Sequence, residues 1–134
     1  MPLRNLVVLL CLLTNWPLLM ASSEEESRLA GLIDEDKRDM PSYISLARLE
    51  LARGDLSAAD ATIKRGLRYA RLSQAKLELR TLGILLEDQN LDFKAALRHY
   101  RRAVRLKENS QFAAVHLAMA KVYLKARNFE QAHE

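Results

Sequence analysis

The residues that could carry out chemistry are few, and they do not cluster in the sequence. The histidines His99, His116 and His133 are widely separated and lack the close spacing to carboxylates that a metal site needs. The only cysteine, Cys11, lies in an apolar run near the N-terminus, so the rest of the chain has no thiol nucleophile or disulfide. No phosphate-binding Gly-rich loop, Gly-x-Ser-x-Gly or His-Glu-x-x-His motif occurs. We therefore expect no enzyme activity, no metal and no cofactor.

Charged residues are the other candidates, and they are unevenly distributed. Residues 24–39 contain seven acidic and three basic side chains, whereas residues 40–134 contain seventeen Lys or Arg against ten Asp or Glu. A basic excess of this size favours acidic peptides, anionic lipid or nucleic acid as partners. It is also compatible with a solvated surface that binds nothing.

One group of arginines has helical spacing and would form a basic stripe on a helix. Contact with an anionic membrane surface is the functional interpretation, and a solvated helix face is the alternative. We expect no binding of nucleic acid if the protein is exported. The stripe consists of Arg98, Arg101, Arg102 and Arg105.

The first 23 residues have the pattern of a secretory signal peptide. A positively charged start is followed by an apolar run and then by small residues at Ala21 and Ser23, as signal peptidase requires. We expect residues 1–23 to be cleaved and the mature protein to be exported, which in a bacterium means the periplasm. The alternatives are an uncleaved inner-membrane anchor over residues 6–20, which is short for a spanning helix, and a cytosolic protein translated from Met20.

Residues 24–39 form an acidic segment before the main domain. Leu29, Leu32 and Ile33 share one helical face. We expect either a short helix or a flexible lead-in, followed by a polar connection.

The remainder, residues 40–134, contains three similar segments, approximately 40–73, 74–110 and an incomplete 111–134. Each predicts two helices joined by a tight turn, because Gly and Asn can end a helix and Asp55 and Asp92 can cap the next one. The turns are predicted at Gly54-Asp55-Leu56, Asn90-Leu91-Asp92-Phe93, with Leu91 as an extra residue, and Asn128-Phe129.

Small residues recur at matching positions, where neighbouring helices must approach closely. We align Ala47, Gly83 and Ala120 in the first helix of each segment, and Ala59, Ala96 and Ala132 in the second. Bulky residues follow one turn later, and small residues three positions after those. These later pairs are Ile63 with Tyr100 and Gly66 with Ala103.

The stretches LARLELARGDLSAADATI and LGILLEDQNLDFKAALRHYRRAV resemble tetratricopeptide repeats (TPR), of the kind found in exported bacterial proteins. The likeness departs from the family in its spacing of 36 to 37 residues, against about 34 in the family, and in Glu50, where an aromatic is preferred. The resemblance implies an all-α fold of antiparallel helix pairs, stacked as a short right-handed superhelix of about two and a half repeats.

The resemblance also implies a peptide-binding groove along the concave surface, lined by the first helix of each pair. The basic members of this set favour an acidic or C-terminal peptide, although a solvated surface is the alternative for each residue. The predicted groove residues are Ile44, Arg48, Leu51, Arg80, Ile84, Glu87, Asp88, Leu117, Lys121 and Lys125.

The third segment stops early, which would leave the face of Met119, Val122 and Tyr123 partly uncovered. We interpret the chain as a fragment of a longer protein, with self-association or a docked partner helix as alternatives. The function expected by analogy is a non-catalytic scaffold or adaptor in the periplasm that helps to assemble an envelope complex, such as a pilus or a secretion or export system. The alternatives are a membrane-anchored TPR protein and a fragment of a larger TPR-containing enzyme or regulator.

Overall fold

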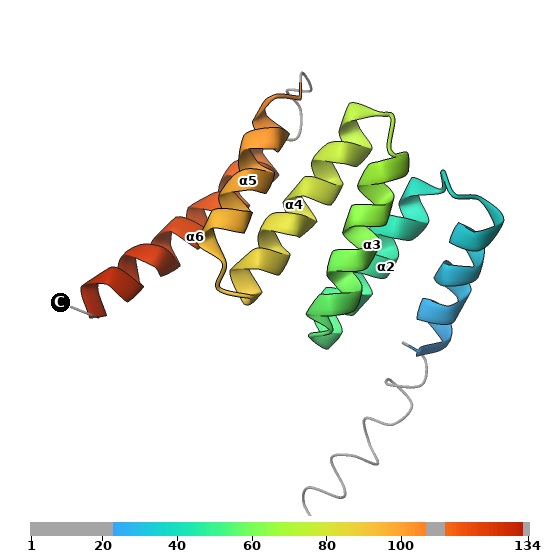
Figure 1. Ribbon diagram of the computed structural model, residues 1–134, viewed down its shortest axis with the longest axis horizontal. Coiled ribbons are helices and arrows are strands. Elements are labelled where there is room, and N and C mark those ends of the chain that lie inside the picture. The colour runs from blue at the N-terminus through green and yellow to red at the C-terminus, as the bar shows by residue number, and fades with distance from the viewer. Residues whose placement is uncertain (1–22, 107–111, 133–134) are drawn as a thin grey trace, which may run out of the picture.

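The computed structural model describes residues 23–106 and 112–132, and these are almost entirely helical (Figure 1). The predicted signal peptide lies outside the described residues, apart from Ser23. No strand occurs in the described ranges, which confirms the all-α prediction. The helices are a segment at residues 23–35, α2 (Met40–Arg53), α3 (Leu56–Tyr69), α4 (Ser73–Gln89), α5 (Phe93–Val104) and α6 (Phe112–Ala132).

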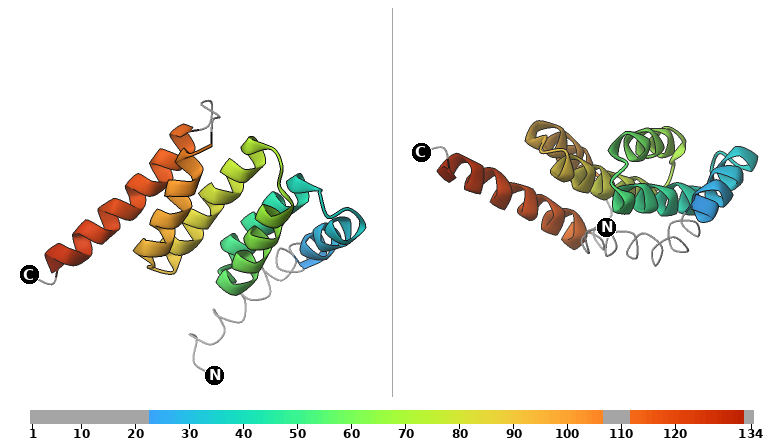
Figure 2. Two further views of the ribbon diagram at one scale, coloured as in Figure 1. Left: turned by 45° about the horizontal axis from the view of Figure 1, so that its top comes forward. Right: turned by 90° about the horizontal axis from the view of Figure 1, so that it is seen from below.

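The helices form antiparallel pairs that stack in chain order. α2 pairs with α3 and α4 with α5, and α4 also contacts α2, α3 and α6. Figure 2 shows the same order from two further directions, with residues 23–35 at one end and α6 at the other. The predicted TPR-like stack of helix pairs is therefore present.

The turns within the two pairs are built alike. Gly54 has a φ of 81° and Leu91 a φ of 57°, and each lies one residue before an aspartate that caps the next helix. Asp55 accepts a hydrogen bond from the Ala58 amide at 3.2 Å, and Asp92 accepts one from the Ala95 amide at 3.0 Å. Both predicted caps are confirmed, because each aspartate satisfies an amide that the helix start leaves unpaired.

Backbone hydrogen bonds across these turns fix the repeat distance at 37 residues. The amide of Asp55 donates to the Glu50 carbonyl and that of Asp92 to the Glu87 carbonyl. In this hydrogen-bond register Leu91 takes the place of Gly54. The helix bounds leave three residues between α4 and α5 and two between α2 and α3, so the second turn is one residue longer, as predicted. Ala47 corresponds to Ile84 rather than to Gly83, as we had aligned it.

The third predicted turn is absent. α6 continues as one helix from Phe112 to Ala132, through Asn128. Among the described residues only Gly54 and Leu91 have positive φ, and neither of the two residues after Asn128, which are Phe129 and Glu130, is an aspartate that could cap a new helix. Helical hydrogen bonding therefore continues where we had expected a turn.

Small residues allow close helix contacts, as predicted for most of them. Ala47, Ala59 and Ala96 are fully buried. A Cβ on Gly66 would lie 3.0 Å from Cδ1 of Leu79 and 3.2 Å from Cβ of Tyr43. Ala120, by contrast, is exposed, because the face of α6 on which it lies is not covered by another described helix.

The acidic segment before the repeats is a helix that covers the start of the stack. Leu29 and Ile33 are 4% and 2% exposed, and Ile33 belongs to the same core cluster as Tyr43. Glu26 pairs with Arg53 at 2.9 Å, which joins this helix to α2. Of the two expectations for this segment, the short helix is therefore confirmed.

Candidate functional site

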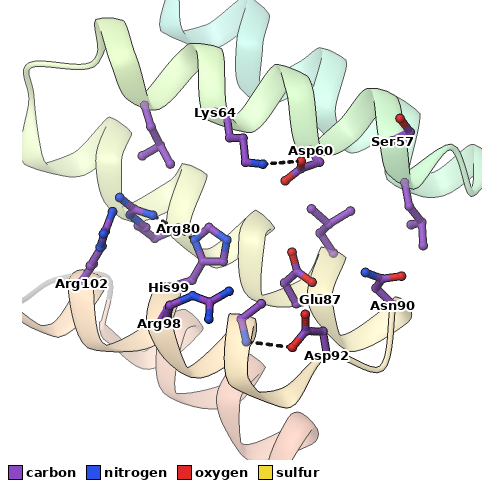
Figure 3. Close-up of a pocket in the computed structure, with 14 residues that line it drawn as sticks. Ser57, Asp60, Lys64, Arg80, Glu87, Asn90, Asp92, Arg98, His99 and Arg102 are labelled. Carbon is purple, nitrogen blue, oxygen red and sulfur yellow. Dashed lines mark hydrogen bonds and ion pairs between the residues drawn. The ribbon is translucent and has the colours of Figure 1, made fainter.

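A groove of about 660 Å³ lies between α3 and α5, with α4 as its floor (Figure 3). This volume falls within the range of about 300–1,000 Å³ that is common for ligand sites. The side chains come from three helices and the α4–α5 turn. They are Leu56, Ser57, Asp60, Lys64, Leu67, Arg80, Leu86, Glu87, Asn90, Asp92, Ala95, Arg98, His99 and Arg102.

One end of the groove is basic. Arg98 and Arg102 are four residues apart on α5 and therefore share a helix face, and both line the groove together with Arg80 of α4. Figure 3 shows Arg80 and Arg102 together at this end. No carboxylate in residues 23–106 or 112–132 lies within ion-pair distance of any of the three.

His99 links the two helices at this end. Nη1 of Arg80 donates a hydrogen bond to Nδ1 of His99 at 3.0 Å, because a guanidinium can only donate. The His99 ring lies directly over Gly83, where an added Cβ would be 2.8 Å from three ring atoms. Gly83 is therefore the residue that leaves room for the histidine.

The ionisation of this end follows from burial and from like charges. Burial, and then Arg80, lower the pKa of His99 to about 4, with further lowering by Arg102 and Arg98 that Asp60 partly opposes. His99 is therefore neutral at pH 7 and can accept from Arg80. Burial and Arg102 also lower the pKa of Arg80, although a guanidinium stays charged near neutral pH. A bound anion would offset both effects.

The other end of the groove is acidic, with Glu87, Asn90 and Asp92 grouped together in Figure 3. Burial raises the pKa of Glu87, and the hydrogen bond with Asn90 opposes the shift. Asp92 is occupied as the helix cap. On the α3 wall Lys64 pairs with Asp60 at 2.8 Å. The groove thus presents positive charge at one end and negative charge at the other.

The groove combines residues that we had predicted on two separate surfaces. Arg80 and Glu87 were expected on the concave side, and Arg98 and Arg102 on a convex stripe, yet all four line this groove. Of the predicted stripe, Arg98 and Arg102 line the groove. The other two, Arg101 and Arg105, are exposed outside the groove.

Three residues predicted to line the concave groove lie in the core instead. Ile84 is fully buried, and Ile44 and Leu51 are each 8% exposed. Ile84 belongs to the cluster that joins α4 to α5 and α6. Side chains packed in this way cannot contact a ligand, so the prediction is corrected for these three. The 37-residue register places Ile84 at the position of the buried Ala47, and Ile44 and Leu51 belong to the core cluster of the first helix pair.

The remaining predicted residues are dispersed. Arg48 lines a separate hollow of about 380 Å³ between α2, α4 and α6, and it lies 3.7 Å from Glu78. Asp88 and Lys125 form an ion pair at 2.9 Å that joins α4 to α6. Leu117 and Lys121 are exposed on α6.

Sequence reasoning missed His99, Lys64 and Asp60 as site residues. For His99 a signal exists in the 37-residue register. Arg80 corresponds to Tyr43, and His99 corresponds to Thr62. In the helix pair α2–α3, the Thr62 hydroxyl donates a hydrogen bond to the buried Glu50. In the helix pair α4–α5, Arg80 instead donates a hydrogen bond to His99. Comparing the two repeats position by position would have shown that Tyr43 and Thr62 are replaced by Arg80 and His99.

Residues 23–106 and 112–132 contain no group of three or more His, Cys, Asp or Glu placed to hold a metal ion. No helix in those ranges combines the length and apolar character needed to cross a membrane. Comparisons with protein-family models, curated protein sequences and solved structures found no match to this chain.

Proposed function

We propose that this protein is a non-catalytic scaffold that binds an acidic segment of a partner protein in the α3–α5 groove. The observation that carries the proposal is that Arg80 and Arg102 lie together at one end of the groove, with Arg98 nearer its middle (Figure 3). Within the described residues, none of these three arginines forms an ion pair with a carboxylate. Guanidinium groups bind carboxylates through paired hydrogen bonds. The open shape suits an extended chain better than a water-excluding reaction.

The stacked helix pairs support membership of the TPR family as part of this proposal, and the signal-peptide pattern of residues 1–23 supports a periplasmic location. There the protein would act as an adaptor in an envelope complex such as a pilus or an export system. Mass spectrometry of the N-terminus of the protein purified from its host distinguishes the cleaved form from the membrane-anchored alternative.

Charge reversal in the groove tests the binding proposal. The probe is a short fluorescein-labelled peptide in which Glu alternates with Ala, and binding is followed by fluorescence anisotropy. We expect the double variant Arg98→Glu and Arg102→Glu to weaken binding about tenfold or more, since losing about 1.4 kcal/mol corresponds to a factor of ten.

The matched control is the double variant Arg101→Glu and Arg105→Glu, which makes the same charge change on α5 and its C-cap but outside the groove. It should bind within about threefold of the unmodified protein. An equal loss in both double variants would mean that only the net charge attracts the probe, and the groove proposal would fail. Binding to anionic vesicles that depends on Arg101 and Arg105 would instead support contact with a membrane surface.

A further inference from the structure

The outer face of α6 carries a stripe of exposed apolar residues. Leu117 and Leu124 are 60% and 62% exposed, and Ala113 and Ala120 lie exposed on the same face. The opposite face contains the buried residue Met119 and packs on α4 and α5. A stripe of this kind on a soluble helix often marks an interaction site.

The stripe occupies positions whose counterparts on α4 are covered. Forty residues separate Leu77 from Leu117 and Ile84 from Leu124. The same spacing relates the inward residues Leu79 and Met119, so α6 repeats the orientation of α4. Leu77 and Ile84 are only 1% and 0% exposed.

Small residues of α5 make this cover possible. Ala96 and Ala103 are fully buried in the same cluster as Leu77 and Ile84, and Tyr100 packs against that cluster between them. The first pair repeats the spacing with Ala59, Ile63 and Gly66 on α3. Among the described residues, therefore, this face of α6 is not covered by a helix with a small residue, a bulky residue four positions later, and a small residue three positions after that.

We propose that this face of α6 binds an acidic amphipathic helix of a partner protein that carries this small–bulky–small spacing. The chain offers a precedent at its opposite end. There the acidic helix at residues 23–35 covers the first pair, with Glu26 paired to Arg53 and Asp34 paired to Arg65 at 3.6 Å.

Charge also selects the partner. The stripe on α6 is flanked by the exposed cations Lys121 and Arg127. A second copy of α6 would bring these like charges together, whereas an acidic helix would neutralise them. This surface shares no lining residue with the α3–α5 groove, so the inference stands or falls separately from the proposed function.

The test uses the full chain and a labelled peptide copied from residues 93–104, in which Lys94, Arg98, Arg101 and Arg102 are replaced by Glu. We expect binding by fluorescence anisotropy that weakens about tenfold or more in the double variant Leu117→Ala and Leu124→Ala. Both leucines are exposed, so the variant should fold, which circular dichroism checks. The matched control Leu72→Ala, at a residue that is 74% exposed elsewhere, should bind the peptide as the unmodified protein does.

Two further comparisons make the result decisive. A second peptide that also carries Ala96→Leu and Ala103→Leu should bind about tenfold more weakly, because its bulk prevents close approach. The groove variant Arg98→Glu and Arg102→Glu should bind the first peptide normally. Loss of binding in that variant, or equal binding to protein with and without the two α6 leucines, would overturn the inference. So would a dimer in analytical ultracentrifugation that the Leu117→Ala and Leu124→Ala changes dissociate.

Discussion

At the scale of single residues, the contact between Arg80 and His99 determines the charge at the basic end of the groove. The histidine accepts from the guanidinium through Nδ1, and this bond requires that Nδ1 carries no proton. The pKa of His99 falls from 6.5 to about 4 because burial and the neighbouring arginines disfavour its charged form. Protonation below that range would break the hydrogen bond and add a positive charge beside three arginines.

This shift makes the stability of the protein depend on His99 in acid. Since the folded pKa is lowered, the unfolded chain binds more protons between pH 6.5 and about 4. The free energy of unfolding should therefore fall as the pH falls through that window, by about 2 kcal/mol from pH 7 to pH 5. Urea unfolding followed by circular dichroism measures this loss.

The variant His99→Gln isolates the effect, because glutamine keeps an acceptor for Arg80 but does not titrate. The variant should lose most of this pH dependence of the free energy of unfolding. Glu50 and Glu87 are present in both proteins, so their contributions to the pH dependence cancel when the two are compared. Their raised pKa values act in the opposite direction, stabilising the fold at low pH. An unchanged loss between pH 7 and pH 5 in His99→Gln would contradict a depressed pKa for His99.

At the scale of secondary-structure elements, the two turns adopt the same backbone conformation with different residues. Both turns need a residue in the left-handed region before the capping aspartate, and Gly54 and Leu91 take that position. Glycine adopts this conformation without steric cost, whereas a leucine there costs roughly 1–2 kcal/mol. Leu91 is 65% exposed and recovers little of that cost by burial.

Exchanging the residue types at the two turns should therefore have opposite effects. We expect Leu91→Gly to raise the free energy of unfolding by about 0.5–1 kcal/mol, and Gly54→Ala to lower it by about 1 kcal/mol. Thermal and urea unfolding of the two single variants measure both changes. A destabilising Leu91→Gly would mean that the Leu91 side chain contributes more through contacts than its backbone costs.

The elements were easier to predict from the sequence than the faces they present. Helix caps and small residues such as Asp55, Asp92 and Ala59 have local signals, so the helix pairs were found correctly. The alignment of Ala47 with Gly83 was one residue out, and one residue turns a helix position by about 100°. That error moved Ile84 from the core to a supposed groove. The turn predicted inside α6 was wrong, because Asn128 alone is a weak signal for the end of a helix when no capping aspartate comes directly after it.

At the scale of the whole molecule, the free energy of unfolding comes from contacts between neighbouring helices along the stack. α2 and α3 make no contact with α5 or α6 within the described residues, and all four contact α4. Such an array behaves as a sum of units and of interfaces between neighbours. Within the described residues, α6 packs on one face only, so we expect it to open most readily.

Hydrogen exchange can test this order. Val115 is fully buried between α6 and its neighbours, so Val115→Ala should cost about 2 kcal/mol. We expect amide exchange in α6 to accelerate about thirtyfold, with a smaller change in α2 and α3. The partly exposed Val104 provides a control in Val104→Ala, which should change exchange little. Equal acceleration in every helix after Val115→Ala would show one cooperative unit instead.

The central position of α4 has a consequence for how two partners would be arranged. The same helix forms the floor of the groove and supports α6. A peptide in the groove and a helix on α6 would therefore be held at a fixed separation and angle, as by a rigid bracket. With a flexible tether, the local concentration of one partner near the other falls as the tether lengthens. When the two sites are joined by packed helices instead, the local concentration no longer depends on the length of a tether.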